Sequence, residues 1–580
     1  MNPIDYFLNP SSVAQKQYEA LRMFFVDKKK GEEVAVLFGY SYRAFTSIVT
    51  NFRKDLRQEL HKDIFFQKSQ KGRKENADKD IIKSIVVDLR KKFYSVEDIK
   101  VIMDGKGHDV SEKNIYLMLK KEGFGRLPRR TKEVKQKLEE THIPAEKSER
   151  ISFEKESFKS ASAGILCFSP YLNKYGIDKI IKQSDYPQTK TLDRLNSILS
   201  FIGLKLSNVR RYSADDLWCM DRGNGLFAGL NVLPKTGWFT SYSDRVTSDM
   251  NLKFLRQLHK LWLSKGLLND TVNLDFTTIP YWGEDAHLEN NWSGKRGKAL
   301  ASMLAVLAHD PDSGLIDYGN TDVMHKDEAK VVLEFLDFYR EGNEKRNDLK
   351  YLIFDSKFTN YENLGKVDAQ GVKFITIRRR GKNIVEQIEH MDKNKWKTIH
   401  VECAGNKGRT LKVADEIIFL KGYGKDIRQI CITGHGKIKP AIIITNDFDL
   451  NLEKIVRKYS RRWLIEKSIA EQIEFFHLNS VSSSMVIKVD FDLTMSILAH
   501  NIYRLFAMDL ERYSNLSVKT LYEKFILNSA DIDIEDEQIV VKLKKKRNLP
   551  LVLETMNQYS NLNYPWFDNK KLIFQGASYS

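Results

Sequence analysis

Residues 272–280, VNLDFTTIP, and residues 351–358, YLIFDSKF, decide how this sequence folds. Each is a short run of apolar, β-branched and aromatic residues that meets a single aspartate, Asp275 or Asp355. Near-continuous hydrophobic runs of this length are typical of strands buried on both faces of a sheet. The sequence therefore predicts two buried strands, each of which delivers a carboxylate to its exposed end.

A third acidic residue, Glu466, lies in YSRRWLIEKS at residues 459–468. Tyr459, Arg462 and Glu466 are spaced three and four residues apart, so a helix would place them on one face, with Trp463 and Ile465 packed inward. Carboxylates in apolar surroundings are costly unless they are paired or bind a metal, and their hard oxygens suit magnesium. The three residues together favour a two-metal nuclease site.

Each of these residues alone has a simpler explanation. An aspartate after an apolar strand usually caps a turn or a helix. An Arg–Glu pair spaced i,i+4 is usually a solvated surface bridge. The metal site is favoured only by the combination of Asp275, Asp355 and Glu466.

The segments resemble the bacterial insertion-sequence DDE transposases of the "IS-four" group, whose catalytic domain is ribonuclease H-like. The third segment of that family reads Tyr, two residues, Arg, three residues, Glu, six residues, Lys. Tyr459, Arg462 and Glu466 match it, whereas Ile473 stands at the Lys position. Lys467 lies roughly 100° around the helix from Glu466 and cannot replace that Lys. The resemblance covers roughly residues 161–512. Besides the three acidic segments it includes residues 305–323, where two strands joined by a turn are expected, and residues 225–245, 359–381 and 441–463.

The resemblance implies a cut-and-paste transposase, in which a metal-activated water cleaves the element end and the freed 3′-hydroxyl attacks target DNA. Asp275, Asp355 and Glu466 would be its catalytic residues and would ligate Mg²⁺, for which Mn²⁺ could substitute. Tyr459 and Arg462 would position the terminal phosphates. The implied partners are double-stranded DNA, as terminal inverted repeats and target, and a second copy of the chain in a homodimer on paired DNA ends.

Length and charge agree with this interpretation. A chain of 580 residues is expected to form several domains, and its net charge of +17 favours a polyanionic partner. No run of eighteen apolar residues and no charged-then-apolar leader is present, which predicts a soluble bacterial cytoplasmic protein associated with the nucleoid and not with a membrane. The cysteines and histidines have no metal-binding spacing, and neither His287 nor His309 is oriented as a general base; the cysteines are Cys167, Cys219, Cys403 and Cys431.

Lys and Arg exceed Asp and Glu in the first 150 residues, where two helix-turn-helix patterns are expected. The first spans residues 31–53, with Ser41 as helix cap. The second spans residues 95–124, with a capping box at Ser95 and Asp98 and with Ser111 as cap. The alternative is a set of ordinary amphipathic helices. Candidate DNA-facing residues are Tyr42, Arg43, Glu112, Lys113 and Asn114, and the segment GRLPRRTK at 125–132 could contact DNA as well. Linkers are expected at 67–80 and within 130–150.

Short β-branched runs between residues 371 and 440 resemble the β-rich insertion that members of the family carry between the second Asp and the Glu. Trp396 could stack on a flipped base, although a structural role in the sheet is favoured. Arg378, Arg379 and Arg380 form a basic turn that could contact phosphate. The run EQIVVKLKKKR at 537–547 predicts a solvated edge strand or a further backbone contact.

The predicted fold is multidomain α/β, in which a ribonuclease H-like mixed sheet flanked by helices follows an all-α DNA-binding region. Two other functions stay open: a catalytically inactive or domesticated relative that binds DNA sequence-specifically, which Ile473 keeps possible, and an unrelated hydrolase with paired carboxylates. The expected divisions are 1–150 (two helix-turn-helix units), 151–265 (helical domain), 266–370 with 441–512 (catalytic core), 371–440 (β-rich insertion) and 513–580 (C-terminal region).

Overall fold

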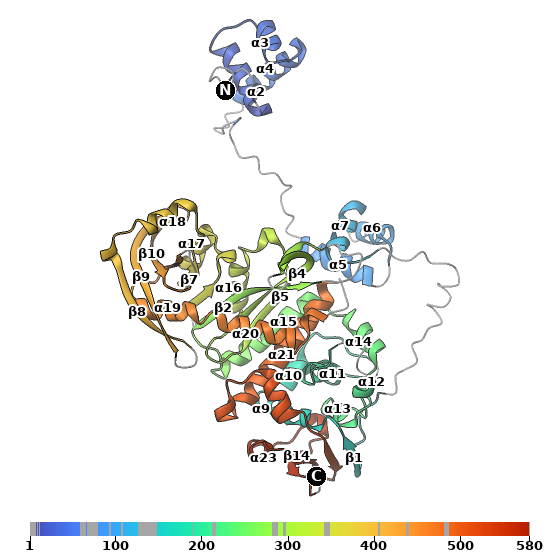
Figure 1. Ribbon diagram of the computed structural model, residues 1–580. Helices are drawn as coiled ribbons and strands as arrows, with labels where there is room; N and C mark the ends of the chain where they lie inside the picture. The colour runs from blue at the N-terminus through green and yellow to red at the C-terminus, as the bar shows by residue number, and fades with distance from the viewer. Residues whose placement is uncertain are drawn as a thin grey trace. The chain divides into compact units, whose positions relative to one another are not determined.

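The fold is described from a computed structural model, in which the chain forms two compact units, Met1–Lys79 and Asp80–Ser580. The two units are described separately below (Figure 1). The structure describes residues 7, 10, 12–57, 65, 79–91, 94–105, 108–125, 148–189, 191–210, 216–280, 288–293, 297–341, 349–403, 407–436, 440–480 and 486–578.

The first unit contains α2 (Val13–Phe25), α3 (Gly31–Leu37) and α4 (Tyr42–Arg57). Gly39 has a φ of +64°, which favours glycine in the turn between α3 and α4. The Ser41 hydroxyl then accepts a hydrogen bond from the Ala44 amide, as expected for a cap. The two helices predicted at residues 31–53 are therefore present. Their core consists of Ala20, Leu21, Val34, Ala35, Phe38, Phe45 and Val49.

The second unit begins with α5 (Lys79–Lys91), α6 (Val96–Gly105) and α7 (Glu112–Lys121). The Ser111 hydroxyl accepts from the Asn114 amide, and Gly123 ends the segment at a φ of +80°, as the sequence predicts. The side chain of Asp98, needed for the predicted capping box, lies outside the described residues, as do the segment 126–147 and most of the linker at 67–80.

A ten-stranded mixed sheet forms the centre of the second unit. Strand β4 pairs antiparallel with both β5 and β2, and then β2, β6 and β7 run parallel to one another. The strands expected at residues 305–323 are thus confirmed as parts of β4 and β5, joined by a turn at 310–314. The bounds are β2 (Thr271–Pro280), β3 (Asn290–Ser293), β4 (Lys298–His309), β5 (Ile316–Val323), β6 (Tyr351–Phe354) and β7 (Lys373–Ile377).

The same sheet continues into the segment predicted as an insertion. Strand β11 pairs antiparallel with β7, and β10, β9 and β8 follow in antiparallel order. The expected β character of residues 371–440 is present, but β7 lies within this range and is also part of the parallel core. The bounds are β8 (Trp396–Cys403), β9 (Lys407–Leu420), β10 (Lys425–Thr433) and β11 (Ala441–Thr445), with α18 (Lys382–Glu389) before β8.

Helices cover the sheet, and α20 packs against β2 and β4 while α21 packs against β5 (Figure 1). The parallel strands β2 and β6 are joined by a crossover that includes α16. The helices at the sheet are α15 (Ser248–Ser264), α16 (Val331–Glu341), α17 (Tyr361–Ala369), α19 (Leu452–Ser460), α20 (Trp463–Glu474) and α21 (Val486–Met508).

Residues 151–265 were expected to form a helical domain, but the structure also contains a strand there, β1 (Glu156–Ser160). This strand pairs antiparallel with β12, more than three hundred residues away in sequence. Five residues with a distant partner leave no local strand signal. The helices of this segment are α9 (Ser169–Lys174), α10 (Ile177–Gln183), α11 (Arg194–Leu206), α12 (Asp216–Cys219), α13 (Arg222–Phe227) and α14 (Thr236–Ser243), with the 3₁₀ helix η1 (Ala163–Phe168).

The C-terminal residues complete a four-stranded sheet in the order β1-β12-β13-β14. The run at 537–547 contains β13, which lies between β12 and β14, so the predicted edge strand is wrong. One hydrophobic core extends from Ile151 to Leu572, so the helical segment, the ten-stranded sheet and the C-terminal sheet share it. The remaining elements are β12 (Ala530–Ile534), β13 (Gln538–Leu543), β14 (Lys571–Gly576), α22 (Val518–Leu521) and α23 (Leu549–Asn557).

A buried ion pair joins α11 to α21 in this core. The Lys205 ammonium lies 2.7 Å from the Asp492 carboxylate and also donates to the Phe476 carbonyl. We expect Lys205→Met to destabilise the protein by about 3–5 kcal/mol, because it leaves Asp492 buried without its cation. The double variant Lys205→Met/Asp492→Leu should recover most of this loss. Urea-unfolding midpoints followed by circular dichroism measure both, and equal losses in the two variants would contradict the argument.

Candidate active site

Asp275 and Asp355 lie next to each other where the parallel pairing of β2 with β6 ends. Asp355 directly follows β6, as predicted, whereas Asp275 lies within β2, which continues to Pro280 beside β4, so the predicted strand-end position is wrong for Asp275. Leu274 pairs with Phe354 in the parallel ladder of β2 and β6, and the two aspartates are the residues that follow this pair. Neighbouring strands are about 4.8 Å apart, so the two carboxylates leave the sheet from adjacent positions. Each also accepts a hydrogen bond from the amide of the next residue, at 2.8 Å for Asp275 and 2.6 Å for Asp355. Asp355 thereby also caps a short 3₁₀ helix, η4 (Ser356–Phe358).

Glu466 is joined to this pair through Arg462. The Arg462 guanidinium donates to the Asp275 carboxylate at 2.6 Å and to the Glu466 carboxylate at 2.7 Å. The guanidinium carbon lies 6.0 Å from the centre of the Tyr459 ring, and burial raises the pKa of the Tyr459 hydroxyl to about 12. The structure thus brings together all the residues that the third segment was predicted to supply.

The expected single helix through these residues is wrong. Helix α19 ends at Ser460 and α20 begins at Trp463, with a turn between them. The Arg461 amide still bonds to the Arg457 carbonyl, whereas the Arg462 amide bonds to the Tyr459 carbonyl, three residues back. The spacing of Tyr459, Arg462 and Glu466 could not reveal this break, because a tight turn also places such residues close together.

The predicted inward packing holds for Ile465, which is buried, and is wrong for Trp463. Trp463 is 36% exposed, and the Lys467 ammonium lies 4.1 Å from the centre of its ring. This cation–π contact occupies Lys467 on the outer face of α20. Ile473 is half-buried in the last turns of the same helix. The position at which the family pattern has Lys is therefore occupied by Ile473, and Lys467 does not replace that lysine.

Burial raises the pKa of Asp275 to about 6. The positive charge of Arg462 and the hydrogen bond from the Phe276 amide oppose this shift, while the nearby charges of Asp355 and Glu466 add to it. The charges of Asp355 and Glu466 therefore disfavour the ionised form of Asp275. A neighbouring cation offsets this repulsion, and Arg462 supplies that cation in this structure.

The donor chemistry of this group fits a hard divalent cation, since its members are three carboxylates. Among the described residues, no three carboxylate, imidazole or thiolate groups already stand in coordinating geometry. The Arg462 guanidinium is bound to two of the three carboxylates. A divalent ion held by all three would therefore have to compete with Arg462.

The predicted basic turn lies beside the second aspartate. The Arg379 guanidinium donates to the carbonyl of Ser356, the residue after Asp355, at 3.3 Å, and the Arg379 side chain is exposed. Arg378 binds the Gln429 side chain at 2.6 Å, and Arg380 binds the Pro440 carbonyl at 3.1 Å. Of the three, Arg379 is the one placed at the edge of the site.

The other predicted residues lie elsewhere. Trp396 is half-buried and packs against a small core beside α18, as the structural alternative for this residue predicted. Arg43 is exposed on α4, and Lys113 and Asn114 are exposed in the first turn of α7. Burial lowers the pKa of His309 to about 3, and His287 lies outside the described residues. Cys167, Cys219 and Cys431 are buried, while the Cys403 side chain is outside the described residues.

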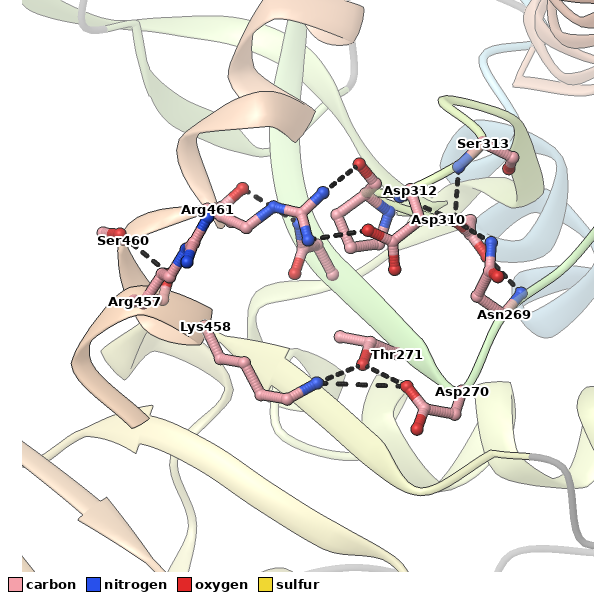
Figure 2. Close-up of polar contacts among 12 residues, drawn as sticks. Asn269, Asp270, Thr271, Asp310, Asp312, Ser313, Arg457, Lys458, Ser460 and Arg461 are labelled. Atoms are coloured by element: carbon pink, nitrogen blue, oxygen red, sulfur yellow. Dashed lines mark hydrogen bonds and ion pairs between the residues drawn. The ribbon is translucent and has the colours of Figure 1, made fainter. Parts of the chain in front are cut away.

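The sequence patterns missed a set of residues that hold the turn between α19 and α20 (Figure 2). Lys458 donates to the Thr271 hydroxyl at 2.8 Å, and Arg461 lies 2.6 Å from the Asp312 carboxylate. The only local signal in the sequence was the turn pattern at 310–314, and this pattern does not indicate that Arg461 binds the turn.

Comparison with known proteins agrees with this geometry. Residues 269–502 match the family model of the transposase DDE domain. The matched range includes Asp275, Asp355 and Glu466 and all strands of the sheet described above. A search of curated proteins found no match to the chain. Residues 269–502 are therefore similar to a transposase DDE domain, as the sequence motifs predicted. No helix among the described residues is long and apolar enough to cross a membrane.

The raised pKa of Asp275 makes stability depend on pH in a defined direction. In the metal-free protein the folded carboxyl keeps its proton up to about pH 6, whereas the unfolded carboxyl loses it near about pH 3.9. The free energy of unfolding should therefore fall as pH rises through this window. Asp275→Asn should remove this loss, so that its stability relative to the wild type rises from about pH 4 to about pH 6 and is then constant. Urea midpoints in EDTA measure it, and a pH-independent difference would contradict the shift.

Proposed function

We propose that this chain, whose residues 269–502 are similar to a transposase DDE domain, is a cut-and-paste transposase of the "IS-four" group of insertion sequences. One observation carries the proposal. Asp275 and Asp355 follow a register pair of parallel strands, and Arg462 joins Glu466 to the first of them, within the matched domain. This arrangement is what a metal-dependent nuclease and strand transferase needs.

The strand order supports a ribonuclease H-like core. The sheet runs through β5, β4 and β2 in antiparallel order and then through β6 and β7 parallel to β2. The first two carboxylates come from the neighbouring strands β2 and β6, and the third comes from a helix that packs on β2. The antiparallel strands β8 to β10 form the proposed β-rich insertion on the far side of β11.

The proposed chemistry assigns a role to each residue. Asp275, Asp355 and Glu466 would hold Mg²⁺ or Mn²⁺, which when bound supplies activation of the attacking oxygen and stabilisation of the leaving oxygen. Asp275 must lose its proton to act as a ligand, which its pKa of about 6 allows at neutral pH. Arg462, released from the carboxylates, and Tyr459 beside it would orient the terminal phosphate. A guanidinium is suited to that role because it binds phosphate oxygens in a bidentate manner.

DNA recognition is assigned to the N-terminal helices. Helix α4, with Arg43, and helix α7, with Lys113 and Asn114, present exposed polar residues in their first turns, where a recognition helix meets base edges. We assign recognition of the terminal inverted repeats to two helix-turn-helix units, α3 with α4 and α6 with α7. Because both ends of an element must be cut and joined, the active form is proposed to be a homodimer on paired ends.

The alternative function is a catalytically inactive or domesticated relative that binds the same DNA without cutting it. Ile473, at the position where the family pattern has Lys, favours this alternative. The two functions predict the same DNA binding and differ in metal-dependent cleavage.

Cleavage of a labelled duplex that carries the gene's own flanking ends separates these functions. With Mg²⁺ or Mn²⁺ we expect strand cleavage at the ends by the wild type. Glu466→Gln should lose more than about 100-fold, because a residue that binds the metal directly matters at least as much as the residues that orient it. Binding of the ends, measured by electrophoretic mobility shift, should be unchanged in the variant. Binding by both proteins with cleavage by neither, under either metal, would favour the regulator.

Arg379 should contribute a phosphate contact at the edge of the site. Arg379→Met should weaken DNA binding and reduce the slope of log affinity against log salt by about 1, because one fewer phosphate is neutralised. The matched control is Lys382→Met, which removes one positive charge from an exposed residue of the neighbouring α18. An equal change in both variants would show a general effect of charge instead of a defined contact.

A further inference from the structure

Two adjacent arginines in the turn between α19 and α20 reach in different directions. Arg462 reaches Asp275 and Glu466 in the site, whereas Arg461 reaches the turn between β4 and β5. The Arg461 guanidinium lies 2.6 Å from the Asp312 carboxylate and donates to the Pro311 carbonyl at 2.8 Å (Figure 2). It thus binds the β4–β5 turn at two points.

Hydrogen bonds to Asp310 fix the turn that Arg461 binds. Asp310 is fully buried, and its carboxylate accepts hydrogen bonds from the amides of Asp312 and Ser313, both at 2.8 Å. It also accepts from the amide of Asn269, just before β2, at 2.5 Å. Figure 2 shows these bonds converging on Asp310 from both segments. Arg461 is therefore attached to a turn that is fixed relative to the start of β2.

Further bonds attach the same junction directly to β2. The backbone carbonyl of Arg461 accepts from the side chain of Asn273, a buried residue two positions before Asp275. Lys458, at the end of α19, donates to the Thr271 hydroxyl at 2.8 Å and lies 3.9 Å from Asp270. The turn that precedes Glu466 is thus bonded to β2, the strand that carries Asp275. These bonds do not involve the carboxylates of the site.

We propose that Arg461 is a positioning residue that sets the distance of Glu466 from the two aspartates through its bonds to Asp312 and Pro311. Arg462 cannot do this in a metal-loaded site, because the carboxylates that it binds would then face the metal. A helix that follows a break needs another fixed point, and Arg461 supplies it. The inference rests on the proposed function, since it concerns the assembly of the same site.

The pair of Arg461 and Asp312 is unlike a stabilising core interaction. Their side chains are 39% and 43% exposed, and exposed ion pairs contribute little to stability. A positioning role therefore makes a distinctive prediction: loss of the pair should impair metal binding and catalysis without unfolding the protein. Outer-shell partners of this kind typically change metal affinity or activity by about 10- to 100-fold.

The test uses the full-length chain with Arg461→Met, which keeps the aliphatic stem and removes the guanidinium, and Asp312→Asn, which weakens the same contact from the other side. Lys454→Met is the matched control, because Lys454 is exposed on α19. Three quantities are measured for each protein: Mn²⁺ affinity from the electron paramagnetic resonance signal of free Mn²⁺, the cleavage rate at saturating DNA, and the dissociation constant for the DNA ends. Arg461→Lys tests whether charge alone is enough.

We expect Mn²⁺ affinity or the cleavage rate at saturating DNA to fall by about 10- to 100-fold in Arg461→Met and by less in Asp312→Asn and Arg461→Lys. DNA affinity and melting temperature should stay at the wild-type values in all of them, and Lys454→Met should behave as wild type. Wild-type values of Mn²⁺ affinity and cleavage rate in both Arg461→Met and Asp312→Asn would overturn the inference while leaving the proposed function in place. If the wild type binds no more Mn²⁺ than Asp275→Asn and does not cleave, the proposed function fails and the inference fails with it.

Discussion

The parallel pairing of β2 with β6 is the interaction on which the rest of the site depends. Parallel strands need a long crossover connection, and here that connection contains β4, β5 and α16. The pairing stops at Leu274 and Phe354, so the next residue of each strand is free of the ladder between them and carries a carboxylate. A shift of one residue in the register would send one of these carboxylates to the other face of the sheet. The apolar core around Leu274 and Phe354 therefore sets the chemistry by fixing the register.

Placing acidic groups together beside an apolar core has an electrostatic consequence. Burial disfavours the ionised form of Asp275, and the neighbouring carboxylates disfavour it further, whereas Arg462 favours it. The same arginine binds Glu466, so a single guanidinium neutralises part of the charge of two elements that are distant in sequence. The proposed binding of a divalent ion would exchange one cation for another at this site. That proposal and the use of Arg462 as an internal counter-ion rest on the same crowding of charge.

The sequence predicted what depends on local pattern. The apolar runs identified β2 and β6 and their aspartates, serine caps identified the starts of α4 and α7, and the Tyr–Arg–Glu spacing identified residues that meet in space. It did not predict features that depend on distant partners. Strand β1 forms only because β12 lies beside it, and β13 is central only because β14 returns to pair with it. The break after Ser460 also involves distant partners, since Arg461 and Lys458 at this junction bind segments that are remote in sequence.

The absence of lysine at position 473 has to be weighed against the other cations around the site. Ile473 is half-buried in the last turns of α20, and Lys467 is occupied by its contact with Trp463, so this helix offers no replacement. Positive charge reaches the carboxylates from two other directions, from Arg462 at the start of the helix and from Arg379 at the Ser356 carbonyl. In the proposed function, these two cations would attract a phosphate toward the site without a lysine at position 473. Isoleucine at that position would then bear on how the phosphate is oriented more than on whether it is attracted.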